Sequence, residues 1–154
     1  MIRPDKILLL APLLFAAHIA EEVPGYVLWY NSIATRGITQ ESFLPGNLVP
    51  FAGTFALAIL AAYTKSRWTT LLLLAWLANF MFANALYHVA ASVAFARYSP
   101  GTITAVIFYL PYFAWLLSYL RSEFQFSLWT LAGVTAIGGL PWFVQGYLVV
   151  TGKV

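Results

Sequence analysis

Two short motifs combine histidine, carboxylate and amide side chains at helical spacing in an otherwise apolar chain. The first, HIAEE, contains His18, Glu21 and Glu22, which project from about one face of a helix because they lie at i, i+3 and i+4. The second, NALYH, contains Asn84 and His88 at i and i+4. Imidazole nitrogens and carboxylate oxygens suit Zn²⁺ and Fe²⁺. These residue types therefore predict metal-assisted activation of a water molecule.

In this interpretation the candidate metal ligands are His18, Glu21, Glu22 and His88. The chain has no cysteine, so any metal must be held by nitrogen and oxygen. The carboxylate of Glu21 or Glu22 that does not bind the metal is the candidate general base. Asn84 is the third catalytic candidate, as an oxyanion stabiliser or as a hydrogen-bond donor behind the ligands. The HxxEE spacing differs from the HExxH of metalloproteases, so the motif alone does not identify a reaction.

Two other interpretations use the same residues. In a proton- or ion-coupled transporter or sensor, Glu21 and Glu22 would gain and lose protons beside the two histidines. In a structural membrane subunit, the polar side chains would only join neighbouring helices, through hydrogen bonds worth about 0.6 kcal/mol each. No pair of similar halves is evident in the sequence, which argues against an inverted-repeat transporter.

The elements that must position these residues are membrane-spanning helices. The chain has 154 residues, of which 62% are hydrophobic and 8% charged, whereas a soluble domain has about 25% charged residues. The eight basic residues lie singly or in pairs beside apolar segments, a distribution that indicates membrane topology and not nucleic-acid binding. We expect an all-α integral membrane bundle in a single domain, surrounded by membrane lipids.

Five segments are predicted to span the membrane: residues 7–28, 47–64, 68–95, 101–120 and 127–150. The first is the shortest in its apolar part, because residues 7–20 extend about 21 Å at 1.5 Å per residue, against a hydrocarbon core of about 30 Å. Its helix is expected to end near Glu22, because Pro24 follows. Residues 29–47 are predicted to form an interfacial cap or short helix.

The placement of basic residues predicts the orientation of the bundle. With five spans, one side has Arg3, Lys6, Lys65, Arg67 and Arg121, and the other has Arg36, Arg97 and Lys153. The positive-inside rule then favours a cytoplasmic N-terminus and an external C-terminus in the cytoplasmic membrane. Counted from the cytoplasmic ends, the two motifs lie within roughly 8 Å of each other in depth. We expect them to share a polar chamber in the outer half of the membrane.

The two motifs resemble the HXXEE domain proteins, a family of small multi-spanning proteins named for the first motif. HIAEE (residues 18–22) matches that motif, and NALYH (residues 84–88) is similar to the N-x-x-x-H element of the family. PGTIT (residues 100–104) also resembles a Pro-Gly element that precedes a hydroxyl residue. The resemblance covers essentially the whole chain. It implies that the five motif residues are signature positions of one shared site, in a family without an assigned activity.

Together these observations predict an intramembrane metal-dependent enzyme. We expect a hydrolase-like protein that activates water, with Zn or Fe as its metal and an apolar or lipid-like small molecule as its substrate.

Overall fold

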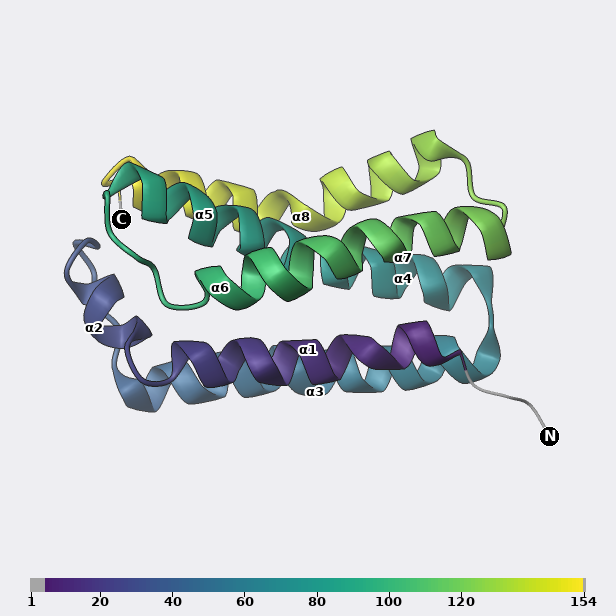
Figure 1. Cartoon of the computed structure of the whole chain (residues 1–154), viewed down its shortest axis with the longest axis horizontal. Helices are drawn as coiled ribbons and strands as arrows, with labels where there is room; N and C mark the ends of the chain where they lie inside the picture. Colours follow the sequence, from purple (N-terminus) through teal and green to yellow (C-terminus); the bar gives the residue numbers. More distant parts are fainter. Residues whose placement is uncertain (1–4, 154) are drawn as a thin grey trace.

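The computed structural model describes residues 5–153 as a bundle of helices that run nearly parallel to one long axis (Figure 1). No strand occurs among these residues, so the predicted all-α, single-domain fold is confirmed. The helices in chain order are α1 (Lys6–Glu22), α2 (Tyr26–Asn31), α3 (Gln40–Thr64), α4 (Arg67–Leu77), η1 (Ala78–Ala83), α5 (Asn84–Ala94), α6 (Thr102–Thr104), η2 (Ala105–Tyr109), α7 (Leu110–Glu123) and α8 (Leu128–Val150).

Several of these elements join into longer helices. The elements α4, η1 and α5 form one continuous helix, Arg67–Ala94, and α6, η2 and α7 form another, Thr102–Glu123. With α3, these are three helices in the described chain that are long and apolar enough to cross a membrane. Helix α1 has 17 residues and is thus about 25 Å long, somewhat short for a span. Membrane crossing is therefore supported for three of the five predicted spans.

The helix ends differ from the predicted spans mainly in the first third of the chain. Helix α1 ends at Glu22, two residues before Pro24, as predicted. The predicted first span, residues 7–28, is divided in the structure into α1 and the first half of α2 (Tyr26–Asn31), so α2 overlaps the predicted cap of residues 29–47 only at its C-terminal half. Helix α3 begins at Gln40 rather than at residue 47, because Thr39 and Ser42 form a reciprocal capping box. Residues 40–46, which resembled a connection, thus belong to the helix.

The bundle has two layers. Helices α1 and α3 lie side by side, and the second layer contains α4, α5, α7 and α8 (Figure 1). Large apolar side chains such as Leu8, Leu77 and Phe113 are fully buried between them. The last turn of α1, the short helix α2 and the start of α6 lie at the same end of the bundle (Figure 1). The residues of the two motifs therefore come together near this end.

Helix α8 packs very closely on the preceding helices. A Cβ atom on Gly138 would lie 2.4 Å from the carbonyl oxygen of Ala75, so only glycine permits this approach. Three residues later Pro141 interrupts the backbone hydrogen bonding of α8. The N–H of the next residue, Trp142, donates to Oδ1 of Asn79 at 3.2 Å. Asn79 thus holds α8 against the η1 turn, which leads directly into the second motif.

Candidate metal centre

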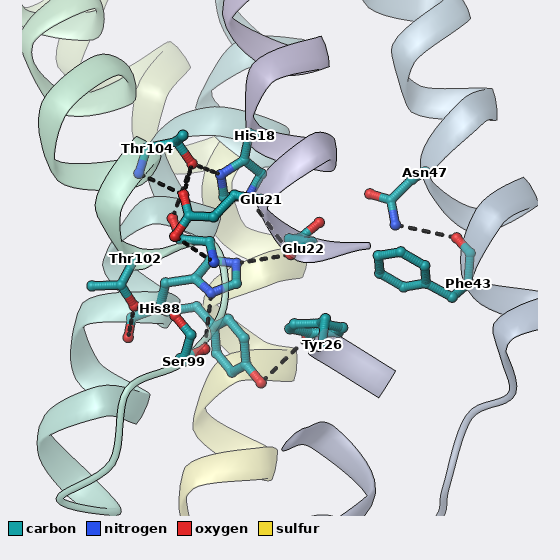
Figure 2. A network of polar contacts seen from close by, with 12 residues as sticks. His18, Glu21, Glu22, Tyr26, Phe43, Asn47, His88, Ser99, Thr102 and Thr104 are labelled. Atoms are coloured by element: carbon teal, nitrogen blue, oxygen red, sulfur yellow. Dashed lines mark hydrogen bonds and ion pairs between the residues drawn. The ribbon is translucent and has the colours of Figure 1, made fainter. Parts of the chain in front are cut away.

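Three side chains from the two motifs converge in the structure. His18 and Glu22 come from the last turns of α1, and His88 comes from α5 (Figure 2). Oε1 of Glu22 lies 3.6 Å from Nε2 of His18 and 3.1 Å from Nε2 of His88. All three side chains are buried: His18 is 1% exposed, Glu22 4% and His88 0%. One ligand atom from each lies within 4.8 Å of the other two, so the group could hold a metal ion.

The two Nε2 atoms make no hydrogen bond with the described residues, although Glu22 is close to both. A buried polar atom without a partner costs about 1–3 kcal/mol, and such atoms are uncommon in folded proteins. Here two of them, on His18 and His88, approach the same carboxylate oxygen. A cation among the three atoms would satisfy both nitrogens and the carboxylate, so the donor set fits a metal.

The other ring nitrogen of each histidine is held by a hydroxyl group. Nδ1 of His18 lies 2.7 Å from Oγ1 of Thr104, and Nδ1 of His88 lies 3.0 Å from Oγ of Ser99. Both hydroxyls belong to the segment that connects α5 to η2. Metal-binding histidines commonly use their second nitrogen in this way, and the contact fixes the ring orientation. Ser99 and Thr104 therefore turn both Nε2 atoms toward Glu22.

The hydrogen-bond network also determines the tautomer of His18. The hydroxyl of Thr104 donates its hydrogen to a carboxylate oxygen of Glu21 at 2.5 Å or to the carbonyl of Gly101 at 3.2 Å. Both of these partners only accept. The contact between Thr104 and His18 must therefore use an N–H on Nδ1 as donor. Nε2 of the neutral ring then keeps its lone pair, the state that a metal requires.

Glu21 lies beside this group and has a different set of partners. One oxygen accepts hydrogen bonds from the hydroxyl of Tyr98 and from the N–H groups of Gly101 (3.0 Å) and Ile103 (3.1 Å). The other accepts from the N–H (2.7 Å) and the hydroxyl (2.5 Å) of Thr104. These donors surround the start of the helix Thr102–Glu123, where free N–H groups and the helix dipole favour an anion. Glu21 thus joins α1 to this helix.

The environment of Glu21 also affects the phenol that contacts it. Tyr98 lies in the connection before α6, outside the long helices. Tyr98 is half exposed, and its partial desolvation, followed by its hydrogen bond to the Glu21 carboxylate, raises the pKa of Tyr98 to about 12. The phenol therefore stays protonated and remains a donor to Glu21 at neutral pH.

Gly101 fits tightly between the two histidine rings. Its φ of +104° lies in a region that favours glycine. A Cβ atom would be 2.7 Å from Cε1 of His88 and 2.9 Å from Cε1 of His18. The Pro-Gly element of the sequence therefore has a physical reason, since only glycine leaves room for both rings.

Each of the two long helices contains a turn of π-helix next to the site. The η1 turn ends immediately before Asn84, and the η2 turn begins immediately after Thr104. A π turn inserts an extra residue and changes the face on which later side chains lie, and such turns are frequent at functional sites. The spacing of apolar residues in the sequence did not indicate either turn.

Asn84 lies near the metal-ligating group but is not part of it. Its side chain is 7% exposed, and its Oδ1 atom has no hydrogen-bond partner among the described residues. Asn84 and Glu22 both line a cavity of about 220 Å³, with Tyr26 and Asn47 on its other walls. The catalytic roles assigned to Asn84, Glu21 and Glu22 from the sequence stay predictions.

Sequence reasoning did not assign roles to several residues of the site. The Pro-Gly element and the hydroxyl after it were a signal for Gly101 and Thr104, but they did not show that the histidine rings would rest on them. Ser99 and Tyr98 had no signal, because a single hydroxyl residue in a connection is common. Their roles become visible only when the connection folds against α1.

The fold and the site together define a helical protein with several apolar helices of membrane-spanning length and a buried group of two histidines and one glutamate. The chain belongs to the family described as "Protein of unknown function with HXXEE motif", whose model matches residues 9–116. This range includes both motifs and confirms the resemblance seen in the sequence. No curated protein and no solved structure matches the chain.

Proposed function

We propose that this protein is an intramembrane metal-dependent enzyme in which His18, Glu22 and His88 hold a divalent ion. The observation that supports this most strongly is that two buried imidazole nitrogens without hydrogen-bond partners approach one carboxylate oxygen. Hydroxyl groups behind both rings keep them in place. Two histidines and one carboxylate are the ligands of many catalytic zinc sites and of non-haem Fe(II) oxygenases.

The number of ligands favours catalysis over a structural role. Structural zinc sites usually have four protein ligands, whereas catalytic sites have three and leave a position for water or substrate. Three ligating residues form the group in the described chain. A metal in such a site supplies a bound water of lowered pKa as a nucleophile. A structural subunit would not need an open position beside a cavity.

The proposed roles of the other residues follow from their contacts. Glu21 is fully hydrogen-bonded at a helix N-terminus, so we assign it to positioning and not to proton transfer. The second oxygen of Glu22 points away from the histidines, toward Asn47 (Figure 2). This oxygen would be available to accept a proton if a metal and its water occupied the group. Asn84, on the cavity wall, would contact the substrate.

We further propose that all five predicted segments cross the membrane, with the N-terminus in the cytoplasm. The helices α1 and α8 run alongside the three that are clearly long and apolar enough to span (Figure 1). The metal group then lies in the outer half of the bilayer. A substrate with an apolar part, such as a lipid-like molecule, would reach it from the membrane.

The contacts of Glu21 also bear on the transporter alternative. A proton-coupled cycle would use both acids of the first motif as groups that gain and lose protons. Five hydrogen bonds from donors hold the carboxylate of Glu21. Protonation of Glu21 would place a further O–H donor among groups that already donate and would weaken its acceptance of their hydrogen bonds, so the arrangement favours a metal centre over a proton path.

Metal content tests this proposal. Protein purified in mild detergent should contain close to one equivalent of zinc or iron by elemental analysis, and both His88→Ala and Glu22→Gln should lose it. Glu41→Gln is the matched control, because Glu41 is an exposed acid outside the group and should leave the metal content unchanged. Metal-free wild-type protein of full thermal stability would contradict the proposal.

Water activation requires a separate measurement. Metal-loaded protein in lipid nanodiscs should incorporate ¹⁸O from labelled water into products of a total membrane lipid extract. Glu22→Gln, which is expected to lose the metal, should also lose the incorporation, whereas Glu41→Gln should retain both. Retention of metal without any labelled product would leave the metal centre in place and argue against hydrolysis of these lipids.

A further inference from the structure

A groove lies between the last part of α7 and the first half of α8, and it begins at the opposite end of the bundle from the metal group (Figure 1). It has a volume of about 530 Å³, within the range of about 300–1,000 Å³ that is typical of ligand pockets. Its walls are mostly apolar and include Phe82 of η1, Leu117 of α7, and Leu128, Leu131 and Ala136 of α8. The metal group uses none of these residues, so the groove is a separate feature.

Arg121 is the only charged residue among the described residues that line the groove. It lies in the last turn of α7, near the end of the apolar helix Thr102–Glu123, where a membrane-spanning helix reaches the level of the lipid headgroups. Arg121 is exposed and forms no salt bridge with the described residues. A guanidinium group binds phosphate through two parallel N–H donors. The groove therefore combines an apolar length with a cation suited to phosphate at its outer end.

The end of the bundle around Arg121 has an excess of positive charge. The guanidinium of Arg67, at the start of α4, lies 4.6 Å from the ring centre of Phe126 in the turn between α7 and α8. A second arginine thus borders this turn. The described charged residues at this end are Lys6, Lys65, Arg67 and Arg121, together with the acids Asp5 and Glu123. Basic residues outnumber the acids, and such an excess attracts anionic lipid headgroups.

The length of the groove matches the depth of one leaflet. From Leu128 to Ala136 its wall follows α8 for about 12 Å, at 1.5 Å per residue. Half of a hydrocarbon core of about 30 Å is about 15 Å. Leu128 is 59% exposed and Ala136 is also exposed, so this wall is open to the surrounding lipids. An acyl chain whose headgroup lies at Arg121 would therefore follow the groove toward the middle of the membrane.

We propose that this groove is a binding site for an anionic phospholipid. The phosphate contacts Arg121, and one acyl chain lies along Leu128, Leu131 and Ala136. A zwitterionic lipid such as phosphatidylcholine has its own cation beside the phosphate, so it gains less from the positive end of the bundle. The inference goes beyond the proposed metal centre and does not depend on it.

Two phospholipids with identical oleoyl chains test the choice of headgroup. The protein is placed in nanodiscs that contain equal amounts of phosphatidylglycerol and phosphatidylcholine, and the lipids that stay bound on release are identified by native mass spectrometry. We expect phosphatidylglycerol to be retained at least fivefold more than phosphatidylcholine, because one basic residue near a membrane surface contributes about that factor. Equal retention of the two lipids would overturn the proposal.

Variants of Arg121 test the contact with the headgroup. Arg121→Gln should remove most of the preference for phosphatidylglycerol, whereas Arg121→Lys should retain most of it because the charge remains. Lys153→Gln is the matched control, since Lys153 lies beyond the end of α8, contacts Tyr147 and does not line the groove. This control should keep the full preference. A full preference in Arg121→Gln protein would overturn the assigned headgroup contact.

Two tryptophan substitutions on α8 test the position of the acyl chain. Ala136→Trp fills the groove and should reduce retention of phosphatidylglycerol at least fivefold. Ile137→Trp, at a position that is 76% exposed and outside the groove, should leave retention unchanged. Metal content and melting temperature of both variants should equal those of the wild type, so a loss of lipid is measured separately from the metal centre. Unchanged retention in Ala136→Trp protein would place the lipid elsewhere and overturn the proposal.

The same spectra reveal whether a second copy of the chain fills the groove instead, because they report the mass of the complex. Wild-type monomer that retains phosphatidylglycerol supports the lipid site. A dimer that Ala136→Trp dissociates, without phosphatidylglycerol on the wild-type protein, would assign the groove to self-association and overturn the lipid site.

Discussion

At the residue scale, the two adjacent glutamates of the first motif have different partners, and the hydroxyl of Thr104 links one of them, Glu21, to His18. The hydroxyl of Thr104 accepts a hydrogen bond from the Nδ1–H group of His18 and donates a hydrogen bond to Glu21. Glu22, one residue further along α1, faces the metal group instead. Adjacent residues of a helix point about 100° apart, so Glu21 can contact the start of the helix Thr102–Glu123 while Glu22 faces the histidines.

Thr104→Val should weaken metal binding about 10- to 100-fold, as is typical when the group behind a metal-binding histidine is lost. Valine keeps the shape of threonine but cannot accept the Nδ1 hydrogen of His18. Affinity is measured by competition with a chelator of known strength. Thr104→Ser should bind metal nearly as well as the wild type, and so should Thr64→Val, which changes an exposed threonine at the far end of α3. Equal affinity of Thr104→Val and wild type would contradict this role.

The raised pKa of Tyr98 predicts that the stability of the fold changes with pH in the alkaline range. Partial desolvation and the hydrogen bond to Glu21 raise the pKa of Tyr98 to about 12, above the value of about 10 expected in the unfolded chain. The folded state therefore retains the proton longer, and the contribution of Tyr98 to stability is complete below pH 10 and lost as pH rises toward 12. The melting-temperature difference between wild type and Tyr98→Phe should be constant from pH 6 to 9 and should shrink above pH 10. A melting-temperature difference that grows above pH 10 would contradict the predicted direction.

The meeting of His18, Glu22 and His88 could be anticipated from the sequence, because helical spacing and depth along two apolar segments depend only on counting residues. The separate role of Glu21 could not. Three of its partners are backbone N–H groups of residues 101, 103 and 104. Nearly every residue has such a group, so residue types in the sequence do not identify these donors. The tautomer of His18 depends on the same contacts.

At the scale of elements, close packing between α8 and α4 depends on one glycine. Gly138→Ala should destabilise the protein by about 1–3 kcal/mol, the usual cost of overpacking, because the new Cβ would lie 2.4 Å from a backbone oxygen. Gly133→Ala in the same helix meets no atom within 4 Å, so it should gain about 0.5–1 kcal/mol from helix propensity. Thermal unfolding in detergent compares the two variants. Equal melting temperatures would show that α8 moves freely away from α4.

The arrangement of elements was predictable where long apolar segments alternate with short polar breaks, and this accounts for α3, α4 with α5, and α7. The start of α3 was misplaced because its first turns, residues 40–46, begin with three polar residues and contain Pro45 and Gly46. There the capping pair Thr39 and Ser42 outweighs composition. The π turns η1 and η2 depend on packing between helices, which no local pattern records.

At the scale of the whole molecule, the five-span arrangement places the connection between α2 and α3 at the opposite end from the turn between α7 and α8 (Figure 1). Because the chain has no cysteine, single cysteines report orientation without background. In intact cells, an impermeant thiol reagent should label Thr35→Cys and should label Ser122→Cys only after the membrane is permeabilised. Labelling of both from outside would contradict five crossings with a cytoplasmic N-terminus.

The attachment of the Tyr98–Thr104 connection to Glu21 has a kinetic consequence. This connection covers the two histidine rings on one side and is held there by five hydrogen bonds. The cavity lined by Glu22 and Asn84 is on the other side. If a metal ion and a lipid-like substrate both entered through this cavity, an occupied cavity would slow exchange of the ion. Residence time of the metal would thus report on occupancy by ligand, even for a ligand that never reacts.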